Sequence, residues 1–280
     1  MRIINASEVT KVVRQLCIDA CRFLEPDMRC AMEKFRAEEP WPIAQKMLDD
    51  IIENYKLAEQ KEAAICQDTG LAVVFVEIGE DVFVEGNLAD AIDKGVRLGY
   101  VEGYLRKSSV SDPLFERKNT GDNSPAVVTY DFVMGDQLKI TVSPKGAGSE
   151  NMSRIKMLRP SDGVEGVRSF VLETVEIAGP NPCPPIVIGV GIGGTYDRAA
   201  LLSKKALVRP LDCRHPDANY SALESELLEA VNGLGIGPQG FGGRTTALAV
   251  NIEWAPTHIA QLPCAINIGC HANRHKTAVL

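Results

Sequence analysis

The sequence predicts an α+β fold, in which a helical N-terminal layer is followed by a mixed sheet domain with flanking helices. Between residues 7 and 59, apolar residues recur at the spacing of a helix. From residue 71 the pattern changes to short strand-like runs separated by turn residues. No repeat or linker divides the chain, so we expect one domain over 1–280, with a helical part at 1–60 and a mixed α/β part at 61–280.

In the N-terminal part, the apolar spacing indicates helices that are broken at Pro26 and at the EEPWP stretch. Two strand-like runs follow, LAVVFVEIG and DVFVEG, with a GED turn between them. A helix is expected next, at roughly 87–106. Residues 107–124 are polar and rich in turn formers, and a loop of this length usually has a function.

The second half of the chain alternates strand-like and helical segments. AVVTYDFV and QLKITVS predict two strands joined at MGD, and the glycine-rich segment PKGAGSENMS follows them. Helices are expected at about 161–178, from about 196, and at 218–232. Three further strand-like runs complete the expected sheet: IVIGVGI, TALAVNIEW and HIAQLPCAINIG.

Composition and charge favour a protein that acts on small molecules. The formal net charge of -7 provides no electrostatic footprint for nucleic acid, and no dense block of Lys and Arg marks a membrane surface. Charged residues interrupt every apolar run of the N-terminal segment, so we expect neither a signal peptide nor a transmembrane helix. We therefore expect the protein in the cytoplasm.

Eight cysteines are many for a reducing compartment, where disulfides do not persist. No CxxC pair occurs, so any metal site has to be assembled from separate loops. Four of the cysteines are interpreted as structural, because apolar residues surround them or no polar group is arranged around them: Cys17, Cys21, Cys30 and Cys264.

Three cysteines lie in loops, beside residues that force irregular backbone or offer polar groups. They are Cys66 in ICQDTG, Cys183 in NPCPP and Cys270 in GCHANRH, and Cys213 in DCRHP is their nearest rival. Three thiolates without a histidine pair suit two kinds of site. One is a zinc ion with an open position, and the other is an iron–sulfur cluster in which one iron has no protein ligand.

Several polar residues are candidates for binding an anion. Lys145 precedes Gly146 in PKGAGSEN, where a cation and exposed backbone N–H groups could meet a carboxylate; a glycine-rich hairpin fits this pattern equally well. Arg106 could offer a bidentate fork to a carboxylate, although an arginine at a helix end is more often solvated. His258 is expected to be a hydrogen-bonded residue near the core, unless the fold brings it to Asp68.

The segment GVGIGG formally satisfies the dinucleotide-binding pattern G-x-G-x-x-G. However, KKALVRPL is a poor second strand, and the motif lies deep in the chain. Tight packing of a strand against a helix is the simpler interpretation of these glycines. A third interpretation is that Gly193, Gly194 and Thr195 line the pocket of a cluster.

The motifs ICQDTG, PKGAGSEN, NPCPP followed by GIGGTYD, and THIAQLP followed by CHANRH occur in this order. Together they resemble the alpha (N-terminal) part of the class I, iron–sulfur-dependent fumarate hydratase and L-tartrate dehydratase family. The resemblance covers nearly the whole chain. Ala147 departs from the family pattern, which usually has glycine at this position of the PKGGGSEN motif.

The resemblance implies a set of site residues. Cys66, Cys183 and Cys270 match the ligands of a [4Fe-4S] cluster whose fourth iron is free to bind substrate. Gln67, Arg106 and the backbone at Gly146 match positions that hold a dicarboxylate, and we add Lys145 as a neighbouring cation. Asp68 and His258 match candidates for acid–base catalysis, with Asp68 in proton transfer and His258 tuning or orienting it.

The implied activity is that of a hydro-lyase that interconverts malate and fumarate; L(+)-tartrate dehydratase is the alternative. A site motif at Cys270 closes the chain, so we expect a separate beta subunit that completes the active site. The family also implies an alpha–alpha contact in a heterotetramer. Two other interpretations do not involve this enzymatic activity. One is an iron–sulfur sensor or cluster-carrying module, and the other is a zinc-binding scaffold.

Overall fold

The computed structural model describes residues 1–280. Helices and mixed sheets make up the chain, which confirms the expected α+β class. The chain forms two compact units. The first unit comprises Met1–Glu25, Tyr55–Ala147 and Arg274–Leu280, and the second comprises Pro26–Asn54 and Gly148–Asn273. The grouping of residues 1–280 as a single domain stays a prediction.

The N-terminal layer is helical, as expected, and follows a short strand, β1 (Arg2–Asn5). Its helices are α1 (Ala6–Arg22), α2 (Pro26–Glu38) and α3 (Pro42–Gln60). The side chain of Asn5 accepts the backbone N–H of Ser7 and caps α1. Pro26 and Pro42 are the first residues of their helices. Proline has no backbone N–H, and the first residue of a helix needs none because this N–H has no partner within the helix. The prolines that interrupt the apolar pattern therefore start new helices.

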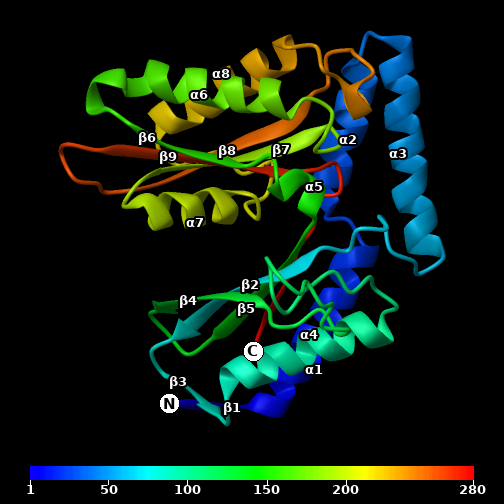
Figure 1. Ribbon diagram of the computed structural model, residues 1–280, viewed down its shortest axis with the longest axis vertical. Helices are drawn as coiled ribbons and strands as arrows, with labels where there is room; N and C mark the ends of the chain where they lie inside the picture. The colour runs from blue at the N-terminus through cyan, green and yellow to red at the C-terminus, as the bar shows by residue number, and fades with distance from the viewer. The chain divides into compact units, whose positions relative to one another are not determined.

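The first unit contains a sheet with strand order β10-β5-β2-β4. Its strands are β2 (Leu71–Gly79), β4 (Val127–Val133), β5 (Leu138–Lys145) and β10 (Lys276–Val279). Strand β2 runs parallel to β4 and antiparallel to β5. Helices α1 and α4 (Leu88–Glu102) pack on each other and on one face of this sheet (Figure 1). A small parallel pair joins β1 to β3 (Val82–Glu85).

Close packing of α1 and α4 depends on a glycine. A Cβ added at Gly95 of α4 would lie 2.7 Å from the Cβ of Val13 in α1. This separation is shorter than any real contact, so the two helix backbones can approach only because residue 95 has no side chain. The apolar side chains around this crossing form the core of the first unit.

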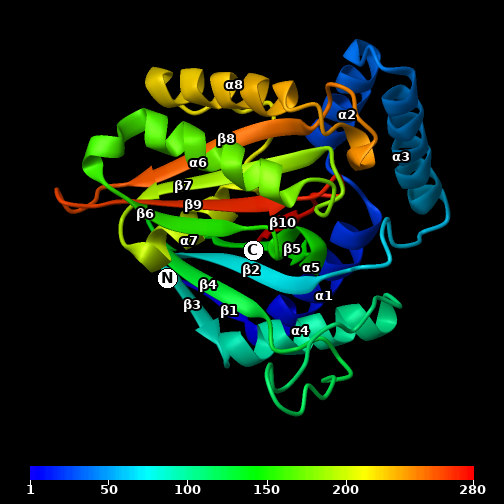
Figure 2. The ribbon, with the colours of Figure 1, turned by 45° about the horizontal axis from the view of Figure 1, so that its top comes forward.

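The second unit contains a sheet with strand order β6-β9-β7-β8. Its strands are β6 (Arg154–Leu158), β7 (Ile186–Gly193), β8 (Ala247–Ala255) and β9 (Leu262–Gly269). Figure 2 shows α6 (Gly163–Ala178) and α8 (Ala218–Gly233) on one face, and Figure 1 shows α7 (Tyr196–Ala206) on the other. Strand β7 runs parallel to β8 and antiparallel to β9. The short elements α5 (Ala147–Glu150), η1 (Pro160–Asp162) and η2 (Pro238–Gly240) lie in connections.

The glycines of GVGIGG allow α7 to pack directly on β7. A Cβ at Gly189 would lie 2.0 Å from the carbonyl oxygen of Ser203, and one at Gly191 would lie 2.0 Å from that of Ala199. Both oxygens belong to α7. The packing interpretation therefore accounts for these glycines without a dinucleotide.

A membrane-spanning helix would need a long, nearly uncharged apolar stretch, and none of the helices described above has one.

Candidate functional site

Cys66, Gln67 and Asp68 lie in a loop that leads directly into β2. Gln67 is exposed, and Cys66 and Asp68 are half-buried. Gly70 ends the loop with a φ of 70°, and a Cβ there would lie 2.5 Å from the backbone of Lys145. Only glycine fits this position. Because Leu71 pairs with Lys145 in the β2–β5 ladder, the loop before β2 lies beside the loop after β5.

This proximity brings Asp68 to the PKGAGSEN segment. Its Oδ1 accepts the backbone N–H of Gly70 at 3.0 Å, and its Oδ2 accepts the backbone N–H of Ala147 at 3.0 Å. A Cβ at Gly146 would lie 3.2 Å from Oδ2, so a side chain at residue 146 would crowd the carboxylate. Two of the predicted site residues, Asp68 and Gly146, are therefore in contact.

The PKGAGSEN segment is a turn from β5 into α5 and not a hairpin, because β5 and β6 belong to different sheets. Lys145 is the last residue of β5, and its side chain is buried. The first N–H of α5, that of Ala147, is bound by Asp68. The segment thus holds a carboxylate of its own chain, and the backbone donor at residue 147 is already used.

Gln67 and Arg106 form a pair. The Nη1 of Arg106 donates to the Oε1 of Gln67 at 2.8 Å, and both side chains are exposed. Arg106 lies four residues beyond the end of α4, in an irregular segment instead of at the predicted helix end. A guanidinium has five N–H donors in a planar fork, so the remaining donors can bind a carboxylate. The structure thus brings together these two predicted substrate-binding residues.

In the second unit, Cys183 and Cys270 lie on neighbouring loops. Val187 pairs with Gly269, so the start of β7 lies beside the end of β9. The carbonyl oxygen of Cys183 accepts the backbone N–H of His271 at 3.2 Å. Cys183 is exposed, Cys270 is half-buried, and Cys183 has a φ of 55°. A non-glycine residue in the left-handed region is uncommon and is often found at a functional site.

Gln239 holds the Cys183 loop, and nothing in the sequence pointed to it. Its backbone N–H and its Nε2 both donate to the carbonyl oxygen of Pro184, at 2.9 Å and 2.7 Å. It belongs to the segment GLGIGPQGFGGRTT, whose composition indicates only turns. A glutamine in such a segment carries no signal of its own, because its partner is a backbone carbonyl far away in the sequence.

His258 lies at the other end of β7 from these cysteines. It is exposed in the loop that joins β8 to β9, and β8 ends opposite Gly193, the last residue of β7. The length of β7 therefore separates it from Cys183 and Cys270, roughly 20 Å at the usual rise of a strand. Its Nδ1 accepts the N–H of Ala260 at 3.1 Å, so in the neutral ring Nε2 carries the proton. The structure does not bring His258 together with the two cysteines of its own unit.

A shallow depression of about 390 Å³ lies beside His258. Apolar side chains from α6, α8 and the start of β9 line most of it, including Val167, Leu223 and Leu262. It contains none of the other predicted site residues.

The remaining cysteines fall into two classes. Cys17, Cys21 and Cys264 are fully buried in apolar cores, which confirms that they are packing residues. Burial raises the pKa of Cys21 to about 11 and that of Cys264 to about 12, and it raises the pKa of Cys17 further. These thiols stay protonated near neutral pH and are poor metal ligands. Cys30 and Cys213 are exposed.

The cysteines in the loops are better suited to bind an iron–sulfur cluster than the cysteines buried in the cores. Cys183 is exposed and Cys66 and Cys270 are half-buried, and all three lie in irregular backbone, where a thiolate ligand can be presented. Cys66 belongs to the first unit, and Cys183 and Cys270 belong to the second. Neither unit gathers three or more His, Cys, Asp or Glu side chains that could hold a metal ion by themselves.

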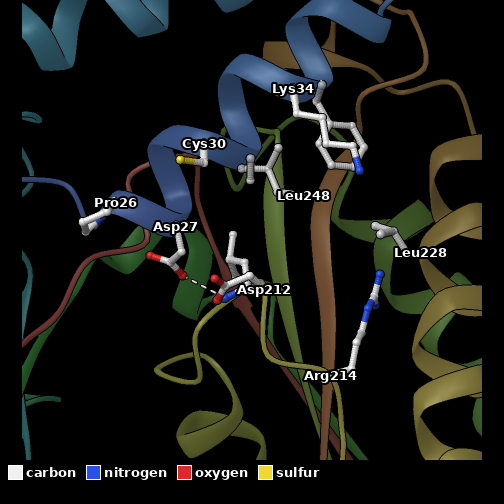
Figure 3. Close-up of a pocket in the computed structure, with 11 residues that line it drawn as sticks. Pro26, Asp27, Cys30, Lys34, Asp212, Arg214, Leu228 and Leu248 are labelled. Carbon is white, nitrogen blue, oxygen red and sulfur yellow. Dashed lines mark hydrogen bonds between the residues drawn. The ribbon is translucent and has the colours of Figure 1, made fainter.

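A second pocket, of about 420 Å³, lies between α2, α8 and the loop before α8. Figure 3 shows the side chains of Lys34 and Arg214 on the side near Leu228, and the carboxylates of Asp27 and Asp212 together on the other side. Asp27 accepts the backbone N–H of Leu211 at 2.8 Å. None of the predicted site residues lines this pocket.

Comparison with known proteins decides the family. The family model described as Fumarate hydratase (Fumerase) matches residues 10–279. The chain belongs to this family. Among its relatives, a protein of Methanocaldococcus jannaschii, provisionally named L(+)-tartrate dehydratase subunit alpha, is 44% identical over 95% of both chains.

Two Escherichia coli relatives of this Fumerase chain are named L(+)-tartrate dehydratase subunit alpha. The protein of strain UTI89 is 33% identical over 97% of this chain and 90% of its own length. That of strain K12 is 32% identical over 98% of this chain and 91% of its own length. Family membership and these relatives make the chain a hydro-lyase of the alpha-subunit type, as expected from the sequence.

Proposed function

We propose that this chain is the alpha subunit of a [4Fe-4S]-dependent hydro-lyase that interconverts malate and fumarate. The observation that carries the proposal is the loop of residues 66–70. It presents a half-buried thiol, an amide paired with a guanidinium, and a carboxylate fixed by two backbone N–H groups, at Cys66, Gln67 and Asp68. These are the groups that a 2-hydroxydicarboxylate dehydratase needs beside a metal.

Cys66, Cys183 and Cys270 are proposed as the three cluster ligands. The proposal rests on their exposed or half-buried positions in loops and on the exclusion of the core cysteines, whose raised pKa disfavours thiolates. It requires the three sulfurs to meet at one cofactor. When bound, the cluster would supply an iron with an open position, which acts as a Lewis acid on the substrate hydroxyl without a redox change.

The remaining residues would bind and orient the substrate. The free donors of the Arg106 fork and the amide of Gln67 suit one carboxylate of a dicarboxylate. Lys145 adds positive charge, and the missing side chain at Gly146 leaves room beside Asp68. Neutralising the two carboxylates also makes the C–H bond next to one of them easier to deprotonate.

Asp68 is proposed as the group that moves the proton. In the dehydration direction it would take a proton from C3 of malate while hydroxide leaves C2, and the double bond of fumarate forms between these carbons. The two N–H donors hold its carboxylate in one orientation. Both accepted bonds use lone pairs of the carboxylate, and each oxygen keeps another lone pair for a proton.

His258 has a different place in the proposal. Since the length of β7 separates it from Cys183 and Cys270, it would not touch a substrate bound to a cluster on those two cysteines. The tuning role expected for it beside Asp68, a residue of the first unit, stays a prediction. We assign proton transfer to Asp68.

A separate beta subunit is proposed to complete the enzyme. The relatives that cover nearly the whole of this chain are named as alpha subunits, which supports a partner chain of another kind. An alpha–alpha contact in a heterotetramer and a cytoplasmic location belong to the same proposal.

L(+)-tartrate is the second candidate substrate, and the names of the relatives favour it. Tartrate dehydration needs the same removal of a proton and a hydroxide, with a pocket that accepts a second hydroxyl. Its product is the enol of oxaloacetate, in place of fumarate.

Co-expression with the beta chain and purification without oxygen would test the proposal. L-malate should produce the ultraviolet absorbance of fumarate, and L(+)-tartrate should produce oxaloacetate, detected by its reduction with NADH and malate dehydrogenase. A preparation that contains iron but dehydrates neither acid would contradict the enzymatic assignment. If the enzyme dehydrates tartrate and not malate, tartrate takes the place of malate as the proposed substrate. The Arg106→Ala variant should lose most of its activity at low substrate concentrations, through a raised KM, while keeping its iron, which a cluster-carrying sensor would not predict.

A further inference from the structure

Asn123 joins the two segments that carry the proposed substrate-binding residues. It is fully buried, although it lies in the polar loop between Arg106 and β4. Its Oδ1 accepts the backbone N–H groups of Ser108 and Ser109, at 2.6 Å and 3.1 Å. Its Nδ2 donates to the carbonyl oxygen of Gly70 at 3.0 Å. One buried amide thus links the segment after Arg106 to the loop of Gln67 and Asp68.

A second contact connects the same two segments. Thr69 is also buried. Its hydroxyl donates to the carbonyl oxygen of Arg106 at 3.1 Å. The hydroxyl of Tyr100 donates to the carbonyl oxygens of Thr69 and Gly70, at 2.9 Å and 3.1 Å, and so fixes the loop to α4. The backbone of Arg106 is therefore held from both sides, by Thr69 at residue 106 itself and by Asn123 at the residues that follow.

The backbone explains why residue 123 is an asparagine. Its φ is 63°, and asparagine tolerates this left-handed conformation better than most residues. The position also needs an acceptor for two N–H groups and a donor for one carbonyl. The asparagine amide provides both at once, whereas an ionised aspartate provides only acceptors.

We infer that Asn123 is a positioning residue for the substrate: through Ser108, Ser109 and Gly70 it fixes the guanidinium of Arg106 relative to Gln67 and Asp68. It does not touch the substrate and acts through Arg106. The inference rests on the proposed function, because it takes Arg106 as the arginine that binds a carboxylate.

The Asn123→Gly variant tests this inference in the assembled enzyme. Glycine accepts the positive φ, so the substitution removes both links without straining the backbone. The KM for the dicarboxylate should rise about tenfold or more, because an arginine without a fixed position binds the carboxylate less well. The kcat should change by less than about threefold, and the iron content should stay the same.

Asn119 offers a matched control in the same loop. It is exposed, donates from its side chain to the Lys107 carbonyl, and accepts the backbone N–H of Gly121. Its side-chain hydrogen bonds go to residues 107 and 121 and not to the loop of residues 66–70. Asn119→Gly removes an equal side chain, and the KM should stay within about twofold of the wild type.

A double-mutant cycle separates positioning from a general loss of structure. In the Arg106→Ala background, Asn123→Gly should raise the KM no further, because the arginine that it positions is gone. An equal rise in both backgrounds, or a wild-type KM in Asn123→Gly, would overturn the inference. If Arg106→Ala itself has a normal KM, the assignment of Arg106 in the proposed function is wrong.

Thr69→Val provides a second test if Asn123→Gly does not fold. Valine has nearly the shape of threonine but cannot donate to the Arg106 carbonyl. The KM of the Thr69→Val enzyme for the dicarboxylate should also rise. In the Arg106→Ala background, Thr69→Val should raise the KM no further. A soluble Thr69→Val enzyme with a normal KM would overturn the inference, as would fast hydrogen exchange at the amides of Ser108 and Ser109 in the wild type.

Discussion

The Oδ2 of Asp68 accepts the backbone N–H of Ala147, a residue 79 positions away, at 3.0 Å. This bond joins the ICQDTG loop to the PKGAGSEN loop, two motifs that the sequence could only place in order. It also gives the proposed proton-transfer group a fixed orientation, since Oδ1 accepts the N–H of Gly70.

Asp68→Asn should abolish turnover without removing the cluster. An amide of the same shape cannot take up a proton from carbon, and loss of a general base typically costs about 10²–10⁴-fold in rate. The kcat for malate should fall by about this factor, while the iron content stays unchanged. Asp81→Asn, an exposed aspartate of the same unit, should behave as the wild type. More than about a tenth of the activity in Asp68→Asn would exclude Asp68 from proton transfer.

Gln67→Glu should weaken substrate binding. It places a carboxylate where an amide oxygen now lies 2.8 Å from the Arg106 guanidinium, so an internal ion pair would compete with the substrate. We expect the KM for malate to rise about tenfold, because charge-assisted hydrogen bonds are roughly twice as strong as neutral ones. Gln67→Met, which frees Arg106 from any partner, should raise it less. Initial rates over a range of malate concentrations test this, and an unchanged KM in Gln67→Glu would show that Arg106 does not bind the substrate.

Glu39 should make the stability of the second unit depend on pH. Its carboxylate is buried and accepts the backbone N–H groups of Trp41, Arg244 and Thr245, together with the Thr245 hydroxyl. Burial raises the pKa of this carboxyl, but these hydrogen bonds outweigh burial and hold the pKa below its usual 4.5. The folded pKa is lower than the unfolded one, so the stabilisation is present above about pH 4.5 and is lost as the pH falls through the folded pKa.

Glu39→Gln should therefore lower the free energy of unfolding by about 2 kcal/mol at pH 7. Urea unfolding of the chain at several pH values would measure this, and the difference from the wild type should narrow below about pH 4. Glu38→Gln changes the exposed neighbour and should have little effect. A pH-independent loss in Glu39→Gln would show that the charge of this carboxylate does not matter.

The cysteines should divide sharply in their reactivity. In the folded chain without metal, iodoacetamide at pH 8 should label the accessible thiols within minutes and leave the core thiols unlabelled, because the thiolate is the reactive form and burial raises the pKa of Cys21 and Cys264. Mass spectrometry of the digested chain would identify the labelled sites. The accessible set is Cys30, Cys66, Cys183, Cys213 and Cys270. Labelling of Cys264 as fast as Cys270 would contradict the packing of the second core.

The strands and helices with strong periodicity could be predicted from the sequence. LAVVFVEIG became β2 and IVIGVGIG became β7, because long apolar runs between turn residues have few alternatives. Strand β6 was not predicted. Its sequence, RIKML, is short and carries two cations, and its pairing with β9 comes from tertiary contacts that leave no local pattern.

The residues of the candidate site also fall into those that the sequence could predict and those that it could not. Motifs with unusual residues, such as ICQDTG, were found because a thiol, an amide and a carboxylate in a row are rarely needed for packing. Asn123 and Gln239 were not found, because each acts by a hydrogen bond to a backbone carbonyl far away in the sequence. His258 was grouped with the cluster loops by resemblance, and the register of β7 with β8 and β9 places it at the opposite end of the sheet.

The iron and sulfide content of single cysteine variants tests the central claim most directly. Each of the eight cysteines would be replaced by serine, and each protein would be purified with its beta partner without oxygen. We predict that the cluster is lost in Cys66→Ser, Cys183→Ser and Cys270→Ser, and that it forms normally in Cys30→Ser and Cys213→Ser. A full cluster in any of the first three variants, or its loss in Cys213→Ser, would contradict the account.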